Sequence, residues 1–382
     1  MLKRRCFTLV LILVSMLVAA AGAAEPGQWT TAKAKQWYSS QPWLVGSNFV
    51  PSTAINELEM WQADTFDPAT IDRELGWAES IGMNTMRVFL HNLLWTEDSK
   101  GFLERMDKFL QIADQHHIRI TFVLLDSVWD PYPKVGKQRE PKPHVHNSGW
   151  VQAPGADILQ DSSRWDKELK PYVVGVLTRF RDDKRVEMWD LMNEPDNDNP
   201  PYGKKEIPNK AALATQLLKQ EWKWARDVNP SQPLTSGVWK GEWGSDAQLS
   251  DTARFQLENS DVITFHSYDK PEVTKAKIES LRRYGRPIVC TEYMARPLGS
   301  TFQAILPLLK EEHMGAYNWG FVSGKSQTIY PWDSWEKQYT GPPPVWFHDV
   351  FYSDGRPYNP AEVQLIKQLT GKEKAKGAAT GH

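Results

Sequence analysis

Residues 189–197 read WDLMNEPDN, so an apolar run ends there in Asn193, Glu194 and Pro195. A strand buried on both faces normally carries apolar residues to its last position. A carboxylate at its end must be paired with another group or put to use, because an unpaired buried charge is costly. The stretch therefore predicts a buried parallel strand with a functional glutamate at its carboxyl end.

Around this strand, short apolar or β-branched runs alternate with amphipathic stretches, which is typical of βα units around a parallel sheet. We expect strands at residues 43–49, 85–90, 119–125, 186–192, 234–239, 262–267, 287–292 and 316–322. We expect helices at residues 66–82, 101–115, 164–181, 210–226, 251–258, 273–284, 301–312 and 360–369. Strands and helices that alternate in this way predict an α/β fold, a single-domain (β/α)8 TIM barrel.

The two ends of the chain differ from the barrel in composition. The first residues, MLKRRCFTLVLILVSMLVAAAGAAEPGQ, combine a basic start, an apolar stretch and small residues up to Ala24, which is the layout of a secretory signal. We assign residues 1–24 to a signal peptide, 25–370 to the catalytic barrel and 371–382 to a disordered tail. We expect a secreted or periplasmic protein that leaves the membrane after cleavage; the alternative is an uncleaved signal anchor.

Charge and cysteine content exclude several kinds of partner and site. Loss of Lys3, Arg4 and Arg5 with the signal changes the formal net charge from −2 to −5, and the other basic residues are scattered. Nucleic acid is therefore not an expected partner. Cys6 leaves with the signal, and Cys290 alone forms neither an intrachain disulfide nor a thiolate metal site. We expect a monomer that needs no cofactor.

The predicted strand ends carry polar and aromatic residues, namely Asn48, Arg87, Asp126, Glu194, Trp239, His266, Glu292 and Trp319. Chemistry in (β/α)8 barrels takes place at the carboxyl ends of the strands. Glu194 and Glu292 end the fourth and seventh strands, which lie across the mouth of an eight-stranded ring. Two opposed carboxylates are what cleavage of a glycosidic bond requires. The alternative is that each glutamate simply pairs with an arginine.

Four motifs carry a family resemblance. WDLMNEPDN, FHSYDKPE, IVCTEY and NWGFV, in that order, resemble glycoside hydrolase family 5 or a close relative in clan A, the large clan of (β/α)8 retaining glycosidases. The resemblance covers essentially the whole mature chain. Asn-Glu-Pro is shared widely across the clan, whereas His266 and Tyr268 together with Arg87 narrow the resemblance towards family 5. It implies a hydrolase that cleaves a plant-type β-glycan or oligosaccharide of the mannan, glucan or xylan type by double displacement.

The resemblance also implies roles for the site residues. Glu194 would be the acid/base and Glu292 the nucleophile. Asn193 would contact the substrate's 2-hydroxyl, and Trp319 would be the platform on which the sugar stacks. Arg87 and Tyr268 would hold the nucleophile, and His266 would lie beside it. The same residues would serve a transglycosylase. A non-catalytic carbohydrate-binding barrel is a further alternative, although binding alone requires neither glutamate.

The chain departs from the family pattern after the third strand. Family 5 enzymes commonly carry Asp-x-His there, but this chain reads Asp126-Ser127-Val128. Trp129-Asp130 follow, a Trp-Asp arrangement similar to that of mannan-cleaving members. His144 or His146 of the next loop would fill the vacant space. The pair also resembles the metal ligands of barrel amidohydrolases, but those end the first strand and have further ligands on later strands. We therefore expect no metal.

The tryptophans divide into two expected groups. A role in packing is expected for Trp77, Trp189, Trp222 and Trp224. The group on the catalytic side consists of Trp61, Trp129, Trp150, Trp239, Trp243, Trp319 and Trp332, and we expect about half of it to touch sugar. Long loops after the first, third and eighth strands would wall off one end of the cleft and favour terminal sugars.

The signal assignment predicts the start of the exported protein. Expression in a secreting host should yield a chain that begins close to Ala24 or Glu25, because signal peptidase cleaves after small residues. N-terminal sequencing of the exported protein checks this. A species that retains Met1 and stays in the membrane would contradict the assignment.

Overall fold

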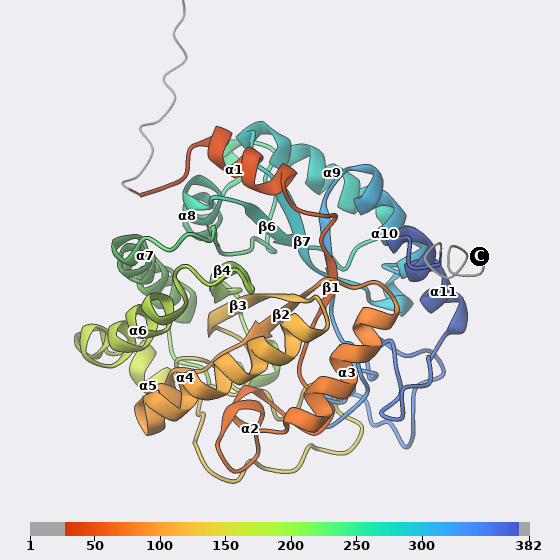
Figure 1. The fold of residues 1–382 in the computed structure, drawn as a ribbon. Helices are drawn as coiled ribbons and strands as arrows, with labels where there is room; N and C mark the ends of the chain where they lie inside the picture. Colours follow the sequence, from red (N-terminus) through yellow and green to blue (C-terminus); the bar gives the residue numbers. More distant parts are fainter. Residues whose placement is uncertain (1–26, 374–382) are drawn as a thin grey trace, which may run out of the picture.

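The strands of the protein form a closed ring in the computed structural model, which describes residues 27–373 (Figure 1). They are β1 Val45–Asn48, β2 Thr85–Phe89, β3 Arg119–Asp126, β4 Val186–Asn193, β5 Leu234–Thr235, β6 Ile263–His266, β7 Ile288–Tyr293 and β8 Gly315–Asn318. The sheet order is β5-β4-β3-β2-β1-β8-β7-β6, with parallel pairing throughout. A parallel bridge from Val238 to Phe265 joins its two ends. The predicted barrel is confirmed.

Two strands, β5 and β8, end four residues earlier than predicted, because the chain departs there from a regular ladder. β5 ends at Thr235, although Val238 still pairs with β6 through its N–H to Thr264 at 3.0 Å. A Cβ on Gly237 would lie 3.2 Å from the His266 ring, so a glycine suits this close approach. β8 ends at Asn318, whose amide donates to the carbonyl of Gly320 at 2.6 Å.

Helices surround the ring (Figure 1). They are α1 Thr31–Ser39, α2 Glu57–Trp61, α3 Pro68–Ser80, α4 Asn92–Gln115, α5 Ala156–Leu159, α6 Lys170–Phe180, α7 Lys210–Val228, α8 Asp251–Asn259, α9 Pro271–Leu281, α10 Phe302–Glu311 and α11 Pro360–Thr370. Asp67 caps the start of α3, because its side chain accepts from the Thr70 N–H, and Pro68 is the first helical residue. Such a cap satisfies one of the amide groups left free at a helix start.

Two helices, α4 and α6, begin six or more residues away from their predicted starts. α4 begins at Asn92 rather than at residue 101, and Asp98 interrupts its helical backbone. The Asp98 side chain accepts from the Gly101 N–H at 2.9 Å, so the predicted start at Gly101 corresponds to a second cap inside α4. α6 begins at Lys170 rather than at residue 164. It follows a 3-10 turn over Ser162–Arg164 and a wider turn over Trp165–Leu169. The short helices α1, α2 and α5 were not predicted from the sequence.

The barrel interior changes from apolar to polar along its axis. Met188, Val262, Val289 and Tyr317 form a buried cluster inside the ring. Nearer the carboxyl ends of the strands, Arg87 is fully buried and makes hydrogen bonds with neighbouring polar side chains. The barrel is thus filled at one level by apolar packing and at the next by charged groups.

Trp61 at the end of α2 belongs to the core outside the ring. It is fully buried, and its indole N–H donates to the carbonyl of Phe89 at 2.8 Å. Its ring lies 5.2 Å from that of Phe109 in α4 and 6.0 Å from that of Phe66. The expectation that Trp61 lines the cleft is therefore wrong. Trp243 is also buried, packing on Phe265.

Several expectations about the chain ends stay predictions, because residues 1–26 and 374–382 lie outside the described part. This applies to the signal peptide and to most of the expected tail. Between residues 27 and 373, none of the helices has the length and apolar character that a membrane span requires.

The burial of Trp61 predicts a large stabilising contribution. Trp61→Ala should lower the free energy of unfolding by about 3–5 kcal/mol, because it empties an aromatic site in a dense core and removes a hydrogen bond to β2. Urea denaturation followed by circular dichroism measures this loss. Tyr132→Ala is the control, since Tyr132 is 51% exposed and should contribute far less. Equal losses in the two variants would show that Trp61 is not a packing centre.

Candidate active site

The carboxyl ends of the strands open into a cavity of about 850 Å³. Its lining comprises Asp126, Val128, Trp129, His146, Asn147, Trp150, Asn193, Glu194, Asn197, Asn199, Pro200, Pro201, Lys204, Trp239, Tyr268, Glu292, Trp319, Trp332, Asp333, Trp335, Glu336 and His348. The remaining predicted strand-end residues, Asn48, Arg87 and His266, are buried outside this lining. The structure thus gathers the predicted site residues at and directly behind one cavity.

Glu194 leaves β4 through an unusual backbone turn. Its φ is +43°, in the left-handed region that costs a residue other than glycine about 1–3 kcal/mol. Asn197 stabilises the turn, because its N–H donates to the Glu194 carbonyl at 3.0 Å and its side-chain amide donates to the Glu194 Oε2 at 2.6 Å. Backbone strain at a cavity wall is typical of functional sites.

Glu292 in β7 is held at both carboxylate oxygens. Arg87 Nη1 lies 2.8 Å from Oε1, and the Tyr268 hydroxyl donates to Oε2 at 2.7 Å. The structure therefore places both residues that were predicted to hold the nucleophile against Glu292. Donors on both oxygens fix the orientation of the carboxylate and favour its charged form.

Arg87 in β2 connects the Glu292 carboxylate to three further side chains. Besides Glu292, its guanidinium donates to Asp190 at 2.8 and 3.0 Å, to Asn48 at 2.9 Å and to Asn193 at 2.8 Å. The planar guanidinium suits this task, because its donors diverge in a fixed geometry. Burial opposes the charge of Arg87, but Asp190 and Glu292 outweigh burial and raise its pKa.

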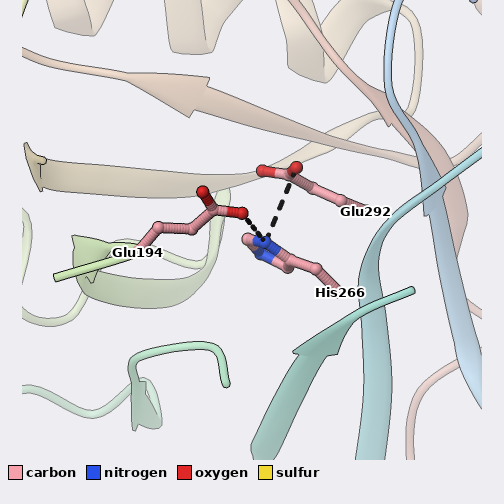
Figure 2. Close-up of side chains that lie close together, drawn as sticks. All are labelled: Glu194, His266 and Glu292. Atoms are coloured by element: carbon pink, nitrogen blue, oxygen red, sulfur yellow. Dashed lines mark hydrogen bonds and ion pairs between the residues drawn. The ribbon is translucent and has the colours of Figure 1, made fainter. Parts of the chain in front are cut away.

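His266 lies between the two glutamates, and Figure 2 shows both carboxylates reaching towards its ring. Its Nδ1 is 2.8 Å from Glu194 Oε1 and 3.5 Å from Glu292 Oε2. One carboxylate oxygen of each glutamate and a ring nitrogen of His266 all lie within 4.8 Å of one another. The two carboxylates therefore face each other across a short gap.

Burial alters the acidity of these groups. It raises the pKa of Glu194 to about 7, although the hydrogen bond from Asn197 opposes this change. Burial also raises the pKa of Glu292, whereas His266 and Arg87 lower it. Burial lowers the pKa of His266 to about 4, so its ring is neutral at neutral pH.

Asp126 at the end of β3 orients Asn193. Asn193 Nδ2 donates to its Oδ1 at 2.9 Å, and Trp150 Nε1 donates to its Oδ2 at 2.8 Å. Burial raises the pKa of Asp126 to about 7, against the effect of these two hydrogen bonds. Of the two histidines expected near this vacant family position, His146 lines the cavity and His144 does not.

Five of the seven tryptophans expected on the catalytic side line the cavity: Trp129, Trp150, Trp239, Trp319 and Trp332. Trp335 lines it too and was missed. Its ring stacks on that of Trp129, with centroids 5.6 Å apart. The predicted packing residues Trp189, Trp222 and Trp224 are buried.

Sequence reasoning also missed Asp190, Asn197 and His348. Asp190 had a visible signal, because it is a charged residue inside the apolar run of β4. Asn197 stands three residues after Glu194, a spacing that a tight turn brings together. His348 had no such signal, since it lies in the long segment after β8 and reaches the cavity only through tertiary packing.

Within residues 27–373, His144 and His146 do not belong to a group of residues that could hold a metal ion. Among residues 27–373, the groups that could hold an ion are limited to Glu194, His266 and Glu292. Arg87 and Tyr268 already donate to the two oxygens of Glu292, which leaves little capacity for a cation there. His144 and His146 each direct Nδ1 at a backbone carbonyl, at 2.8 Å in both cases.

Comparison with known proteins shows likeness in structure rather than in sequence. No protein-family model matches the chain, and no curated protein matches its sequence. The β-mannanase of the blue mussel Mytilus edulis superposes with a TM-score of 0.56 at 15% identity, over 86% of this chain and 92% of that chain. A family 5 mannosidase from Rhizomucor miehei gives 0.51 at 15% identity, over 89% and 95%.

The endo-β-1,4-mannanase of Thermotoga petrophila gives a TM-score of 0.55 at 15% identity, over 90% of this chain and 80% of that chain. At such identities the likeness concerns the fold. The fold implied by the resemblance of the motifs to glycoside hydrolase family 5 is thereby confirmed, and the chain has the (β/α)8 barrel of these solved glycoside hydrolases.

Proposed function

We propose that the protein is a retaining glycoside hydrolase that cleaves β-glycosidic bonds by double displacement. The observation that carries this proposal is the short gap between Glu194 and Glu292, because one carboxylate oxygen of each lies within 4.8 Å of the other. Retaining enzymes hold their two carboxyl groups about 5–5.5 Å apart, whereas inverting enzymes need about 6.5–9.5 Å to admit a water molecule. The gap supports direct attack by one carboxylate.

Glu292 serves as the nucleophile. Arg87 and Tyr268 donate to its two oxygens and keep the carboxylate charged and aimed. In the first step, a Glu292 oxygen bonds to the anomeric carbon and the bond from that carbon to the leaving oxygen breaks. In the second step, water attacks the same carbon and the ester to Glu292 breaks, so the configuration is inverted twice.

Glu194 serves as the acid and then as the base. A pKa of about 7 lets it hold a proton at neutral pH and give that proton to the leaving oxygen. Once Glu292 is esterified, its negative charge is gone, so Glu194 becomes more acidic. It can then accept the proton of the attacking water. His266 contacts both glutamates and orients the pair.

A β-mannan-type glycan or oligosaccharide is the substrate class that we favour. The solved structures reported above include two mannanases and a mannosidase, and all share the fold of this chain. Asn193 is the candidate contact for the 2-hydroxyl, because Asp126 and Arg87 fix its amide beside Glu194. Trp319 offers a flat face on which a sugar ring can stack.

The assignment of Glu292 predicts covalent labelling and chemical rescue. A 2-fluoro glycoside slows breakdown of the intermediate, so peptide mass spectrometry should find the label on Glu292. Glu292→Gly should lose activity and regain turnover with azide, which takes the place of the lost carboxylate. Glu336→Gly is the matched control, since Glu336 also lines the cavity, and it should keep its activity.

The same mechanism fixes the stereochemistry of the product. NMR at early times should show a first product with the anomeric configuration of the substrate. An inverted first product, or a label on another residue, would overturn the assignment.

The assignment of Glu194 predicts a bell-shaped pH profile of kcat/KM. The basic limb should fall as the pH rises through about 7, because Glu194 then loses the proton that the leaving group needs. The acidic limb reflects protonation of Glu292. Glu194→Gln should remove the basic limb and slow substrates with poor leaving groups by about 10²–10⁴-fold.

Activated aryl glycosides distinguish loss of the acid from general damage. They need little protonation, so Glu194→Gln should still release a burst of phenol in the first step. Stopped-flow absorbance measures this burst. Equal losses on activated and poor substrates would show that Glu194 is not the acid.

A further inference from the structure

Two long segments cover one side of the cavity and are tied to each other. Residues 127–155 follow β3, and residues 319–359 follow β8. The Asn147 N–H donates to the Ser326 carbonyl at 2.8 Å, and the Trp335 indole donates to the His146 carbonyl at 2.8 Å. Stacking of Trp129 on Trp335 adds an aromatic contact between the segments. We call this pair of segments the end wall.

The end wall stands close to the nucleophile. Tyr268 donates to Glu292, and its ring lies 5.1 Å from that of Trp332 and 5.6 Å from that of His348. Both of these wall residues also line the cavity. Tyr268 therefore contacts both Glu292 and the end wall.

Other residues of the cavity surround the acid. Asn197 contacts Glu194, and Trp239 donates to Asp196 at 2.8 Å. These residues follow β4 and β5. A retaining glycosidase places its acid beside the leaving group and its nucleophile beside the anomeric carbon. The part of the end wall formed by His146, Trp332 and His348 thus faces the sugar that reacts, and Trp239 faces the rest of the chain.

Two buried histidines give the end wall a polar surface. His146 and His348 line the cavity with their ring centroids 5.4 Å apart. Each directs Nδ1 at a backbone carbonyl, of Tyr330 and of Met294 respectively. A carbonyl only accepts, so Nδ1 carries the proton and Nε2 is left as an acceptor in the neutral ring.

The two Nε2 atoms are acceptors of neutral rings. Burial lowers the pKa of His146 to about 4 and that of His348 well below its usual value, so both rings are neutral. His348 Nε2 is buried without a hydrogen-bond partner among the described residues. Neutral acceptors suit the hydroxyl groups of a neutral sugar and disfavour a carboxylate.

We infer that the enzyme acts from the non-reducing end and removes one neutral sugar at a time, with the end wall stopping the chain and His146 accepting from a hydroxyl of that sugar. This inference rests on the proposed function, because it assigns sides of the cavity from the roles of Glu194 and Glu292. It makes His146 a specificity-determining residue of the reaction.

Aryl glycosides of increasing length test the end wall. The probes are 4-nitrophenyl β-glycosides that carry one, two or three β-1,4-linked sugars, in a mannose and a glucose series. The one-sugar compound should be cleaved at once. The three-sugar compound should release nitrophenol only after a lag, with an initial rate lower by at least about tenfold, because terminal sugars must leave first.

The two proposals fail in different ways. Prompt and faster release of nitrophenol from the three-sugar compound would show that the end wall does not stop the chain. The proposed glycosidase function would still stand. Release from no compound of either series would instead count against the proposed function. A reducing-end-labelled β-1,4-mannohexaose or cellohexaose that yields an early ladder of labelled fragments would also overturn action from the chain end.

Substitution of His146 tests its contact with the sugar. His146→Phe keeps the ring but removes the acceptor, and should lower kcat/KM for the one-sugar glycoside by about 10-fold or more, mainly through KM. His146→Gln retains an acceptor and should recover part of the loss. His117→Phe is the matched control, because His117 is exposed and precedes β3 at the other end of the barrel, and it should behave as the wild type.

Two results would remove His146 from the specificity role. One is an unchanged KM in His146→Phe. The other is cleavage of 4-nitrophenyl β-glucuronide as fast as the β-glucoside, since the neutral acceptors should disfavour the carboxylate of the former. Circular dichroism of each variant distinguishes loss of binding from loss of folding.

Discussion

The buried guanidinium of Arg87 is the interaction on which the site depends. Arg87 has no exposed surface and contacts two carboxylates, Asp190 and Glu292, inside the barrel. Removing a partner from a buried ion pair typically costs about 3–5 kcal/mol, because an uncompensated charge is left behind. The same cation thus makes a buried nucleophile tolerable and holds it in place.

The network around Arg87 also joins strands that are distant in the sequence. Its guanidinium reaches β1, β4 and β7 through Asn48, Asp190, Asn193 and Glu292. From Asn193 the network continues to Asp126 in β3 and then to Trp150. This network connects five strands of the barrel. The geometry of the candidate site therefore depends on the closure of the ring.

Two residues of the cavity wall have a backbone conformation that the loop after β4 stabilises. Glu194 and Trp129 both adopt a positive φ, at 43° and 75°, and both line the cavity. Such conformations persist only where the surroundings over-determine them. Asn199 does this for Trp129 by accepting from its N–H at 3.1 Å and donating to its carbonyl at 2.6 Å. The strained residues are thus held by side chains of the loop after β4.

Local sequence patterns determined the barrel, the two opposed glutamates and their immediate partners. Periodicity places strands and helices, and parallel strands in a ring bring their carboxyl ends to one face, so Glu194, Glu292 and Arg87 could be placed at that face. The contacts of Arg87 and Tyr268 with Glu292 were implied by the family resemblance. Where a pattern was ambiguous, as with the capping turn at Asp98 inside α4, the boundary was wrong.

Only the tertiary structure decided which aromatic residues line the cavity and what closes it. Trp61 lies in the segment after β1 and Trp319 in the segment after β8. Trp61 nevertheless packs in the core, whereas Trp319 lines the cavity. His348 reaches the cavity through contacts with Tyr268 and His146, which are distant in sequence. Long loops carry no periodic pattern, and their side chains are placed by packing against other segments, so the local sequence does not reveal their positions.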